Sequence, residues 1–372
     1  MTLVLPYPEL GDAFAADRMP PDVIHLDAAA AGRASRSVLR AMSDHLDSEA
    51  RLGGYIAQAE AADLIEQGRS AAAELLGFPP TDIQFTESAT GALAGLLTRM
   101  HVPRGSTVLV APGEYGPNLG LFRMFGLVVD QLPVADEAGH LDVSAVATLI
   151  ETTRPAMVHL CLHPSHRGVV LDVAPIASIC RAFGVPLVVD AAQGIAHLPT
   201  NFDADAVYAT SRKWLCGPRG VGLIAVRQGL LPDGMPALES HEANIAGRVG
   251  LAVALSEHLS LGPEKVRERL GAIGKLTRHR LDGISGWSVI EQTNEPSAVT
   301  TLQPPAGWSD SDLFGFRESL AAGSAAERRI VTTYAGAERA PLQAKSAVLR
   351  ISPHLDVRAS DLDCLAEALR QT

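Results

Sequence analysis

Between about residues 60 and 226, short apolar runs alternate with helix-forming segments, and this alternation restricts the fold more than any other feature. The expected helices are Asp63–Gly77, one that opens near Thr90, and Val173–Phe183. The expected strands are Asp82–Thr86, Thr107–Ala111, Met157–Leu162, Pro186–Asp190, Ala206–Ala209 and Gly222–Val226. Continuous apolar strands interleaved with helices are typical of a mostly parallel sheet covered on both faces. The predicted fold class is therefore α/β, with a doubly wound sheet.

The pattern changes after residue 230. Two long helices are expected at about 242–259 and 263–284, followed by short strands that alternate with further helices. This order indicates a smaller α+β domain. We expect an N-terminal arm at 1–20 that joins the small domain, a large domain at 21–245 and the small C-terminal domain at 246–372.

Charge and cysteine usage narrow the classes of partner. The formal net charge is −11, and no Lys/Arg block of five or six residues is present, which argues against nucleic acid or an acidic membrane surface as a partner. No apolar run reaches the roughly 18 residues of a membrane span, and the N-terminal residues do not resemble a signal peptide. The four cysteines are scattered without a CxxC pair, as in a reducing compartment. We expect a cytoplasmic protein.

Ligands of doubly wound sheets bind beyond the carboxyl ends of the strands, and polar residues gather there in this sequence. Asp190 ends one expected strand and Tyr115 follows another, while Thr86–Ala92 leads into a helix whose N-terminus could accept a phosphate. Lys213, one of only four lysines among 31 basic residues, follows a fourth strand. Each feature alone also fits an ordinary helix cap or turn. His163 and His166 lack an acidic ligand nearby and do not predict a metal site.

Together, these residues match the needs of one ligand. A lysine can lose its proton and form a Schiff base, whereas an arginine cannot. Thr210 and Arg212, beside Lys213, suit phosphate oxygens, a carboxylate at Asp190 could pair with a protonated ring nitrogen, and Tyr115 could lie flat on a ring. The combination predicts pyridoxal 5'-phosphate (PLP) as the cofactor.

With these residues, the chain resembles the class V aminotransferase family of fold-type I PLP enzymes, which includes cysteine desulfurases, selenocysteine lyase and isopenicillin-N-epimerase-like proteins. The resemblance covers nearly the full length and rests on five motifs. They are Leu26-Asp-Ala-Ala-Ala30, Glu114-Tyr-Gly-Pro-Asn118, Asp190-Ala-Ala-Gln193, Thr210-Ser-Arg-Lys213 and Arg350-Ile-Ser-Pro-His354. It implies the fold-type I architecture, a small-molecule amino-acid substrate and a homodimer with active sites at the subunit interface.

The resemblance also assigns roles residue by residue. The implied catalytic residues are Lys213, Asp190 and Tyr115, with Tyr115 in the place of a ring-stacking histidine. The implied cofactor-binding residues are Ala89, Thr90, Tyr115, His166, Asp190, Gln193, Thr210, Arg212 and Lys213. Arg350 is expected to hold the substrate α-carboxylate, and Ala29 and Tyr55 are the other expected substrate-binding residues.

Three departures from the family pattern shape the expected reaction. His166 stands where relatives carry a cofactor-facing asparagine, and the motif of a partner-subunit threonine reads His241-Glu-Ala-Asn244, to which we assign no phosphate contact. The segment 333–345 lacks the cysteine with which desulfurases take up sulfur. The resemblance therefore implies a PLP-dependent carbon–sulfur lyase whose substrate, a cysteine S-conjugate sulfoxide, releases its sulfur as a sulfenate.

Other activities stay open from the sequence. An epimerase or lyase of another amino acid would use the same cofactor residues, and a catalytically silent relative would keep the fold alone. A nicotinamide dehydrogenase is the weakest alternative, because no glycine-rich turn joins a strand to a helix.

Overall fold

The computed structural model describes residues 5–231, 238–240, 242–323 and 328–372 of the chain. Its largest sheet has seven strands in the order β2-β8-β7-β6-β5-β3-β4. These strands are β2 Ile83–Thr86, β3 Thr107–Val110, β4 Val128–Gln131, β5 Met157–Cys161, β6 Leu187–Asp190, β7 Ala206–Thr210 and β8 Gly222–Val226. Neighbours from β7 through β4 are parallel, and β8 runs antiparallel to both β2 and β7. The predicted mostly parallel sheet is confirmed.

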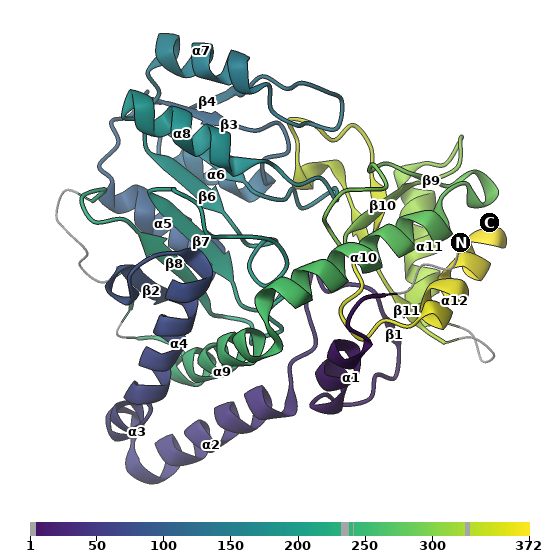
Figure 1. The fold of residues 1–372 in the computed structure, drawn as a ribbon, viewed down its shortest axis with the longest axis horizontal. Coiled ribbons are helices and arrows are strands. Elements are labelled where there is room, and N and C mark those ends of the chain that lie inside the picture. The colour runs from purple at the N-terminus through teal and green to yellow at the C-terminus, as the bar shows by residue number, and fades with distance from the viewer. Residues whose placement is uncertain (1–4, 232–237, 241, 324–327) are drawn as a thin grey trace.

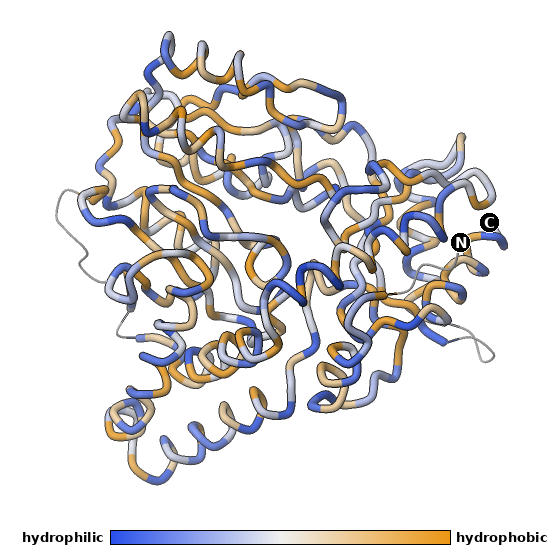
Figure 2. The backbone as a smooth tube through the Cα atoms, viewed as in Figure 1, coloured by the Kyte–Doolittle hydropathy of each residue, from blue (hydrophilic) through white to orange (hydrophobic). Residues whose placement is uncertain are grey.

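Helices cover both faces of this sheet (Figure 1). They are α4 Ala62–Leu76, α5 Ala89–Arg99, α6 Gly116–Met124, α7 Val143–Thr153 and α8 Val173–Phe183. Successive strand residues alternate between the faces: Val108 packs in the cluster with α5 and α6, while Leu109 packs in the cluster with α4, α7 and α8. Because both faces are buried, the central strands are largely apolar, as the hydropathy colouring shows (Figure 2), and polar residues such as His159 and Asp190 are exceptions.

The pairing register brings the carboxyl ends of the central strands together. Cys161 at the end of β5 pairs with Asp190 at the end of β6, and Asp190 pairs with Tyr208 of β7. The side chains that follow these strands therefore share one edge of the sheet, which is where the sequence predicts the cofactor site.

A second, antiparallel sheet has the order β12-β13-β10-β9. Its strands are β9 Ser288–Val289, β10 Thr300–Gln303, β12 Thr333–Ala335 and β13 Val348–Ile351, accompanied by α10 Pro263–Leu281, α11 Asp310–Ala322 and α12 Ala359–Arg370. The short strand β1 Ile24–His25 pairs in parallel with β11 Ile330–Val331. The 3-10 turns are η1 Pro80–Asp82, η2 Ile284–Gly286 and η3 Ala337–Arg339.

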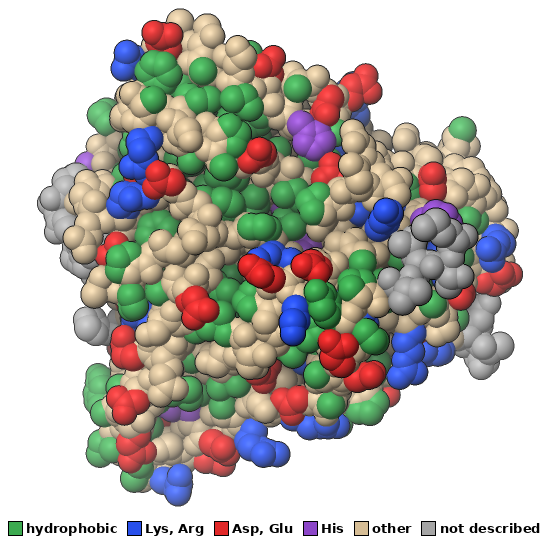
Figure 3. All heavy atoms as spheres, in the orientation of Figure 1, with side chains coloured by type: hydrophobic (Ala, Val, Ile, Leu, Met, Phe, Trp, Pro, Cys, Tyr) green, Lys and Arg blue, Asp and Glu red, His purple; other side chains and the backbone are tan. Residues whose placement is uncertain are grey.

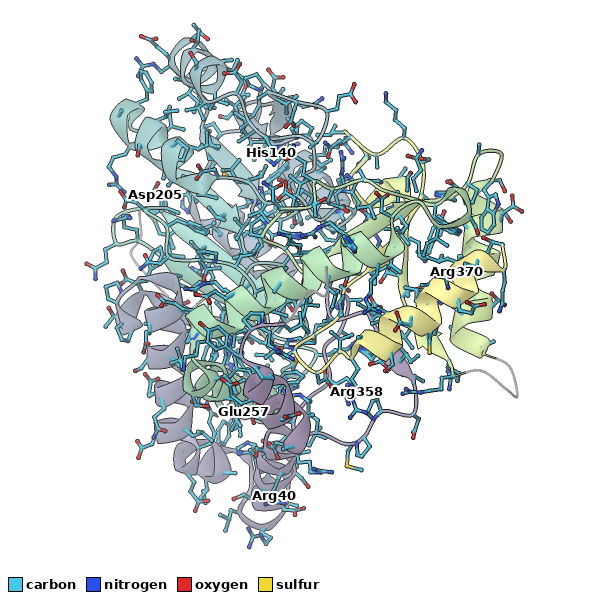
Figure 4. All side chains as sticks on the ribbon, turned by 45° about the vertical axis from the view of Figure 1, so that its right-hand side comes forward. Arg40, His140, Asp205, Glu257, Arg358 and Arg370 are labelled. Atoms are coloured by element: carbon cyan, nitrogen blue, oxygen red, sulfur yellow. The ribbon has the colours of Figure 1, made fainter. Side chains whose placement is uncertain are left out.

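The remaining helices are α1 Pro8–Ala16, α2 Arg36–Leu52, α3 Gly54–Glu60 and α9 Ile245–Leu261. Helix α9 packs against α2 and α4. Glu257 of α9, which is labelled in Figure 4, accepts a hydrogen bond from the Ser35 hydroxyl at 2.6 Å. The Arg269 guanidinium of α10 donates to the backbone oxygens of Pro6, Tyr7 and Leu355, which fastens the segment before α1 to the C-terminal part. The domain limits at 20/21 and 245/246 stay a proposal.

The sequence pattern predicted the buried elements better than the exposed ones. Val173–Phe183 and Gly222–Val226 form as expected, whereas α2, α3, α6, α7 and β4 were not anticipated. Strand β4 lies at the sheet edge with largely exposed residues, so it lacks the apolar run that marks its neighbours. Within the described ranges, no helix is both long and apolar enough to cross a membrane.

Candidate active site

A cavity opens at the carboxyl edge of the large sheet, where β2, β5, β6 and β7 end. Its wall contains every predicted cofactor residue except His166. The lining residues are Ser88, Ala89, Thr90, Tyr115, Asn118, Cys161, His163, Ser165, Asp190, Ala192, Gln193, Thr210, Arg212 and Lys213.

One end of the cavity is suited to a phosphate. Ser88 caps α5 by accepting a hydrogen bond from the Gly91 N–H at 3.0 Å, so the free N–H groups and the positive dipole end of α5 face the cavity. A side chain at Gly222 would place its Cβ 2.6 Å from the Ala209 oxygen and 2.9 Å from the Ser88 carbonyl carbon. Because residue 222 is glycine, β8 can pack directly against the turn that precedes α5. Arg212 supplies a cation at the same wall.

Asp190 presents a buried carboxylate to the cavity. Its Oδ1 accepts from the Ala192 N–H at 2.8 Å, and its Oδ2 accepts from the Asn118 amide at 3.1 Å. The same amide donates to Glu114 at 2.8 Å, so Asn118 bridges two carboxylates. These bonds fix the orientation of Asp190 without using all of its acceptor capacity.

A buried polar network continues behind Asp190. The Glu114 carboxylate lies 2.8 Å from Nδ1 of His159, whose Nε2 lies 2.9 Å from the Tyr208 hydroxyl. Burial lowers the pKa of His159, but the charge and hydrogen bond of Glu114 outweigh it and the net shift is upward. Burial together with the charges of Asp190 and Glu114 raises the pKa of Tyr208 well above its usual value. The network thus favours the protonated form of the His159 imidazole beside two carboxylates.

Lys213 follows β7 and lines the cavity on the side of Asp190. Burial, opposed by the charge of Asp190, lowers the pKa of its amine from 10.5 to about 8. A substantial share of the amine is therefore neutral near physiological pH, the form that attacks a carbonyl. Gly32 permits this placement, since its Cβ would lie 2.4 Å from the Lys213 backbone oxygen.

Arg350 lies on β13, behind the cavity wall, and is almost fully buried. Its guanidinium donates to the Ser165 oxygen at 2.5 Å and to the Thr333 hydroxyl at 3.0 Å, and lies 3.5 Å from the Asp27 carboxylate. Burial lowers its pKa to about 10, so it remains a cation at neutral pH. Its buried Nε has no hydrogen-bond partner among the described residues. A carboxylate is the natural acceptor for such a donor.

The other predicted residues fall into two groups. Tyr115 lies on the cavity wall as the N-cap residue of α6, and the Ala29 oxygen accepts a hydrogen bond from Gln193 at 2.9 Å. Tyr55 is on α3 with 88% of its surface exposed, and it does not line the cavity. His166 is buried beside the cavity but does not line it, and burial lowers its pKa to about 3.

Several lining residues were not assigned from the sequence. Asn118 stands inside the motif that starts at Glu114, so its position was available as a signal. His163, considered only as a metal ligand, lies on the wall with its Nε2 2.7 Å from the Ser297 hydroxyl. The described residues contain no group of three or more side chains that could hold a metal ion. His241 lies outside the described residues, and Asn244 caps α9 by accepting from the Gly247 N–H.

Comparison with known families defines the class. Residues 24–363 match the family described as Aminotransferase class-V, and the chain belongs to this family. PLP is the cofactor typical of the family. The cavity fits it, since a helix N-terminus, a buried carboxylate and a lysine with a lowered pKa meet in one space.

Individual relatives are similar over nearly the whole chain. A probable hercynylcysteine sulfoxide lyase of Mycobacterium tuberculosis is 44% identical, covering 97% of this chain and 93% of the relative. An isopenicillin N epimerase of Amycolatopsis lactamdurans is 27% identical, covering 95% of this chain and 96% of the epimerase. The apo structure of a cysteine desulfurase from Thermococcus onnurineus has a TM-score of 0.82 at 19% identity, covering 100% and 98% of the two chains. This likeness confirms the fold-type I architecture.

Proposed function

We propose that this protein is a PLP-dependent carbon–sulfur lyase that cleaves hercynylcysteine sulfoxide by β-elimination. The products are a sulfenate, which is then reduced to the thiol ergothioneine, together with pyruvate and ammonia. The observation that carries the proposal is the combination of the 44% identical relative with a cavity that offers lysine, carboxylate and phosphate-binding groups but no reactive thiol.

The state of the cysteines favours this reaction over desulfuration. Segment 333–345 contains no cysteine, and of the four cysteines only Cys161 lies on the cavity wall. Burial, with the charges of Asp190 and Glu114, raises the pKa of Cys161 well above its usual value. Its thiol therefore stays protonated and is a poor acceptor for sulfur. The substrate has to carry its own leaving group.

The wall residues have distinct parts in holding the cofactor. Asp190, oriented by Asn118 and Ala192, would keep a ring nitrogen protonated, and Tyr115 would lie against the ring. The N-terminus of α5 at Ala89 and Thr90, with Thr210 and Arg212, would hold the phosphate. Bound PLP supplies an electron sink for the electron pair that remains at Cα after the proton leaves.

Lys213 is the proposed general base. The Nζ atom, whose pKa is about 8, would accept the Cα proton of the substrate in its neutral form. Arg350 is expected to hold the α-carboxylate through its unpartnered Nε and so to orient the Cα–H bond toward Lys213.

The elimination balances without an oxidant. The Cα proton passes to Lys213, the Cβ–S bond breaks, and its electron pair leaves with sulfur as a sulfenate anion. A sulfenate is a better leaving group than an alkyl thiolate. Water then converts the three-carbon fragment to pyruvate and ammonia, and a thiol reductant reduces the sulfenate by two electrons.

A homodimer is the proposed assembly. Helices α2 and α3 expose large apolar side chains: Leu39 at 51%, Leu46 at 53%, Leu52 at 42%, Tyr55 at 88% and Ile56 at 57%. Figure 3 shows hydrophobic side chains on the lower left, over these helices. Burial of this face by a second copy would remove its apolar surface from water and would bring Tyr55 to the partner's cavity.

The free cysteines favour a reducing compartment, and we propose the cytoplasm.

The test is pyruvate release by the PLP-loaded protein with three substrates: L-cysteine, a simple S-alkylcysteine sulfoxide and hercynylcysteine sulfoxide. The proposal predicts rapid pyruvate formation from the hercynyl compound and slow formation from the other two. Equal rates on all three would overturn the substrate assignment, and no pyruvate from any would overturn the lyase assignment.

A further inference from the structure

The side-chain amide of Gln193 lies on the cavity wall between two fixed partners. Its oxygen accepts a hydrogen bond from the indole N–H of Trp214 at 2.9 Å. Its nitrogen donates to the backbone oxygen of Ala29 at 2.9 Å. Trp214 follows Lys213 directly in the sequence, so this contact joins the lysine segment to the segment after β6.

These partners determine which way the amide faces. An indole N–H is a donor only, and a carbonyl oxygen is an acceptor only. The amide oxygen of Gln193 therefore has to face Trp214, and the nitrogen has to face Ala29. One N–H is used by Ala29, and the second N–H is left for the cavity. If the Gln193 amide were turned over, its NH₂ group would face the indole N–H of Trp214 and its oxygen would face the Ala29 oxygen, so neither hydrogen bond could form.

Trp214 is itself held in place. Its ring stacks on His197 with 3.9 Å between centroids, and its backbone oxygen accepts from Nε2 of His354 at 3.1 Å. His197 accepts from the Ala298 N–H at Nε2, so its proton is on Nδ1, which donates to the Gln193 backbone oxygen. Trp214 and the backbone of Gln193 are thus fixed by one set of contacts.

Gln193 is one of the cofactor-binding residues that the family resemblance implies, with the ring hydroxyl oxygen as its partner. We propose that Trp214 is a positioning residue, whose indole N–H holds the Gln193 amide in the orientation that offers an N–H donor to that oxygen. This inference rests on the proposed cofactor site and not on the identity of the substrate. The donor stabilises the form of the cofactor in which that oxygen is charged.

The variant Trp214→Phe tests the proposal, because it keeps an aromatic ring for stacking and removes only the donor. In the PLP-loaded protein without substrate, the pH midpoint of the cofactor absorbance change should rise by about one pH unit, as expected for a weakened hydrogen bond to a charged group. Trp287→Phe is the matched control, since Trp287 is also fully buried and donates its indole N–H, to the Thr372 hydroxyl. An unchanged midpoint in loaded Trp214→Phe protein would overturn the proposal.

A double-variant comparison separates orientation from general disturbance. Gln193→Leu removes the donor itself and should raise the midpoint as well. If Trp214 acts through Gln193, the double variant should shift no further than Gln193→Leu alone. Additive shifts would overturn the proposal and assign Trp214 an independent role.

A spectroscopic measurement covers the case in which Trp214→Phe does not fold. The chain has three tryptophans, so ¹⁵N labelling of their indoles gives three N–H resonances; Trp287→Phe and Trp308→Phe identify two, and the third is that of Trp214. In folded Gln193→Leu protein, the Trp214 resonance should move while those of Trp287 and Trp308 stay. An unmoved Trp214 resonance would overturn the contact. None of these outcomes depends on pyruvate formation, so they are independent of the proposed lyase activity.

Discussion

The two sides of the proposed active site differ in how completely their polar groups are paired. On the cofactor side, Asp190, Asn118, Glu114 and His159 are buried and joined to one another by hydrogen bonds. On the substrate side, buried polar atoms have no partner within the described part of the chain: the Ser165 hydroxyl and Nε of Arg350.

This difference separates two tasks. A paired, buried network holds a carboxylate at one orientation and charge before any ligand binds, which is what preorganised catalysis requires. Unpaired buried donors cost free energy unless a ligand accepts from them. We therefore interpret the cofactor side as preformed and the substrate side as completed by the carboxylate of the substrate.

The largest expected effect is that of Lys213→Ala. Turnover should fall by at least about 10³-fold, since a general base alone contributes roughly 10²–10⁴-fold. Pyruvate formation in the PLP-loaded protein measures this loss. Lys275→Ala, an exposed position on α10, is the control and should keep full turnover. Comparable turnover in the two variants would contradict the role of Lys213.

Glu114→Gln should damage the cofactor side even in the apoprotein. Breaking a buried ion pair by removal of one partner costs about 3–5 kcal/mol. The raised pKa of His159 means that the pair stabilises fully below pH 6.5 and that this contribution is lost as pH rises through the folded pKa. Denaturant unfolding should therefore show a larger deficit at pH 6 than at pH 9. The control is Glu74→Gln at an exposed position. A pH-independent deficit would argue against the ion pair.

Arg350→Ala should affect substrate binding more than the cofactor. A hydrogen bond to a charged group is worth about 1.5–3 kcal/mol, so KM should rise roughly 10- to 150-fold. Arg350→Lys, which keeps the charge but not the guanidinium Nε donor, should fall between Arg350→Ala and the unaltered enzyme. The spectrum of the bound cofactor should not change. An unaltered KM would remove the carboxylate role.

The pKa of Lys213 predicts how cofactor loading depends on pH. Only the neutral amine attacks the aldehyde, and the pKa is lowered from 10.5 to about 8. The loading rate of apoprotein should rise about tenfold per pH unit below 8 and level off above it. Stopped-flow absorbance would record this. A rate that still rises steeply beyond pH 9 would place the lysine in a more hydrated setting.

The smallest effect is expected for the cysteines. Cys364 is exposed on α12, and Cys364→Ala should leave turnover nearly unchanged. Cys161→Ala should retain pyruvate formation, because the protonated thiol takes up no sulfur. Loss of elimination in either variant, with cofactor still bound, would revive a persulfide mechanism.

The sequence was most informative where function follows directly from strand order. Asp190 and Lys213 each come directly after a buried strand, and parallel pairing of β6 with β7 brings them together. His163 and His166 show the limit, since both stand in one loop and the sequence does not say which faces the cavity. The partner of His163 is Ser297, which is 134 residues away. Its orientation therefore depends on packing between the two sheets.

The hydrogen bond from Trp214 to Gln193 was also beyond the sequence. The two residues are 21 positions apart, and their contact depends on the stacking of Trp214 on His197. Tyr55 differs from these residues because it is exposed on α3, so it would contact other residues only in an assembly of subunits. Local patterns predict elements and strand ends, but not which side chains meet across them.

The most direct test of the account is to find which lysine carries the cofactor. The PLP-loaded protein is reduced with borohydride and digested, and the peptides are mapped by mass spectrometry. Four lysines are available, namely Lys213, Lys265, Lys275 and Lys345. The account predicts the pyridoxyl mass on the peptide that contains Lys213 and on no other. A modification at another lysine, or none at all, would contradict it.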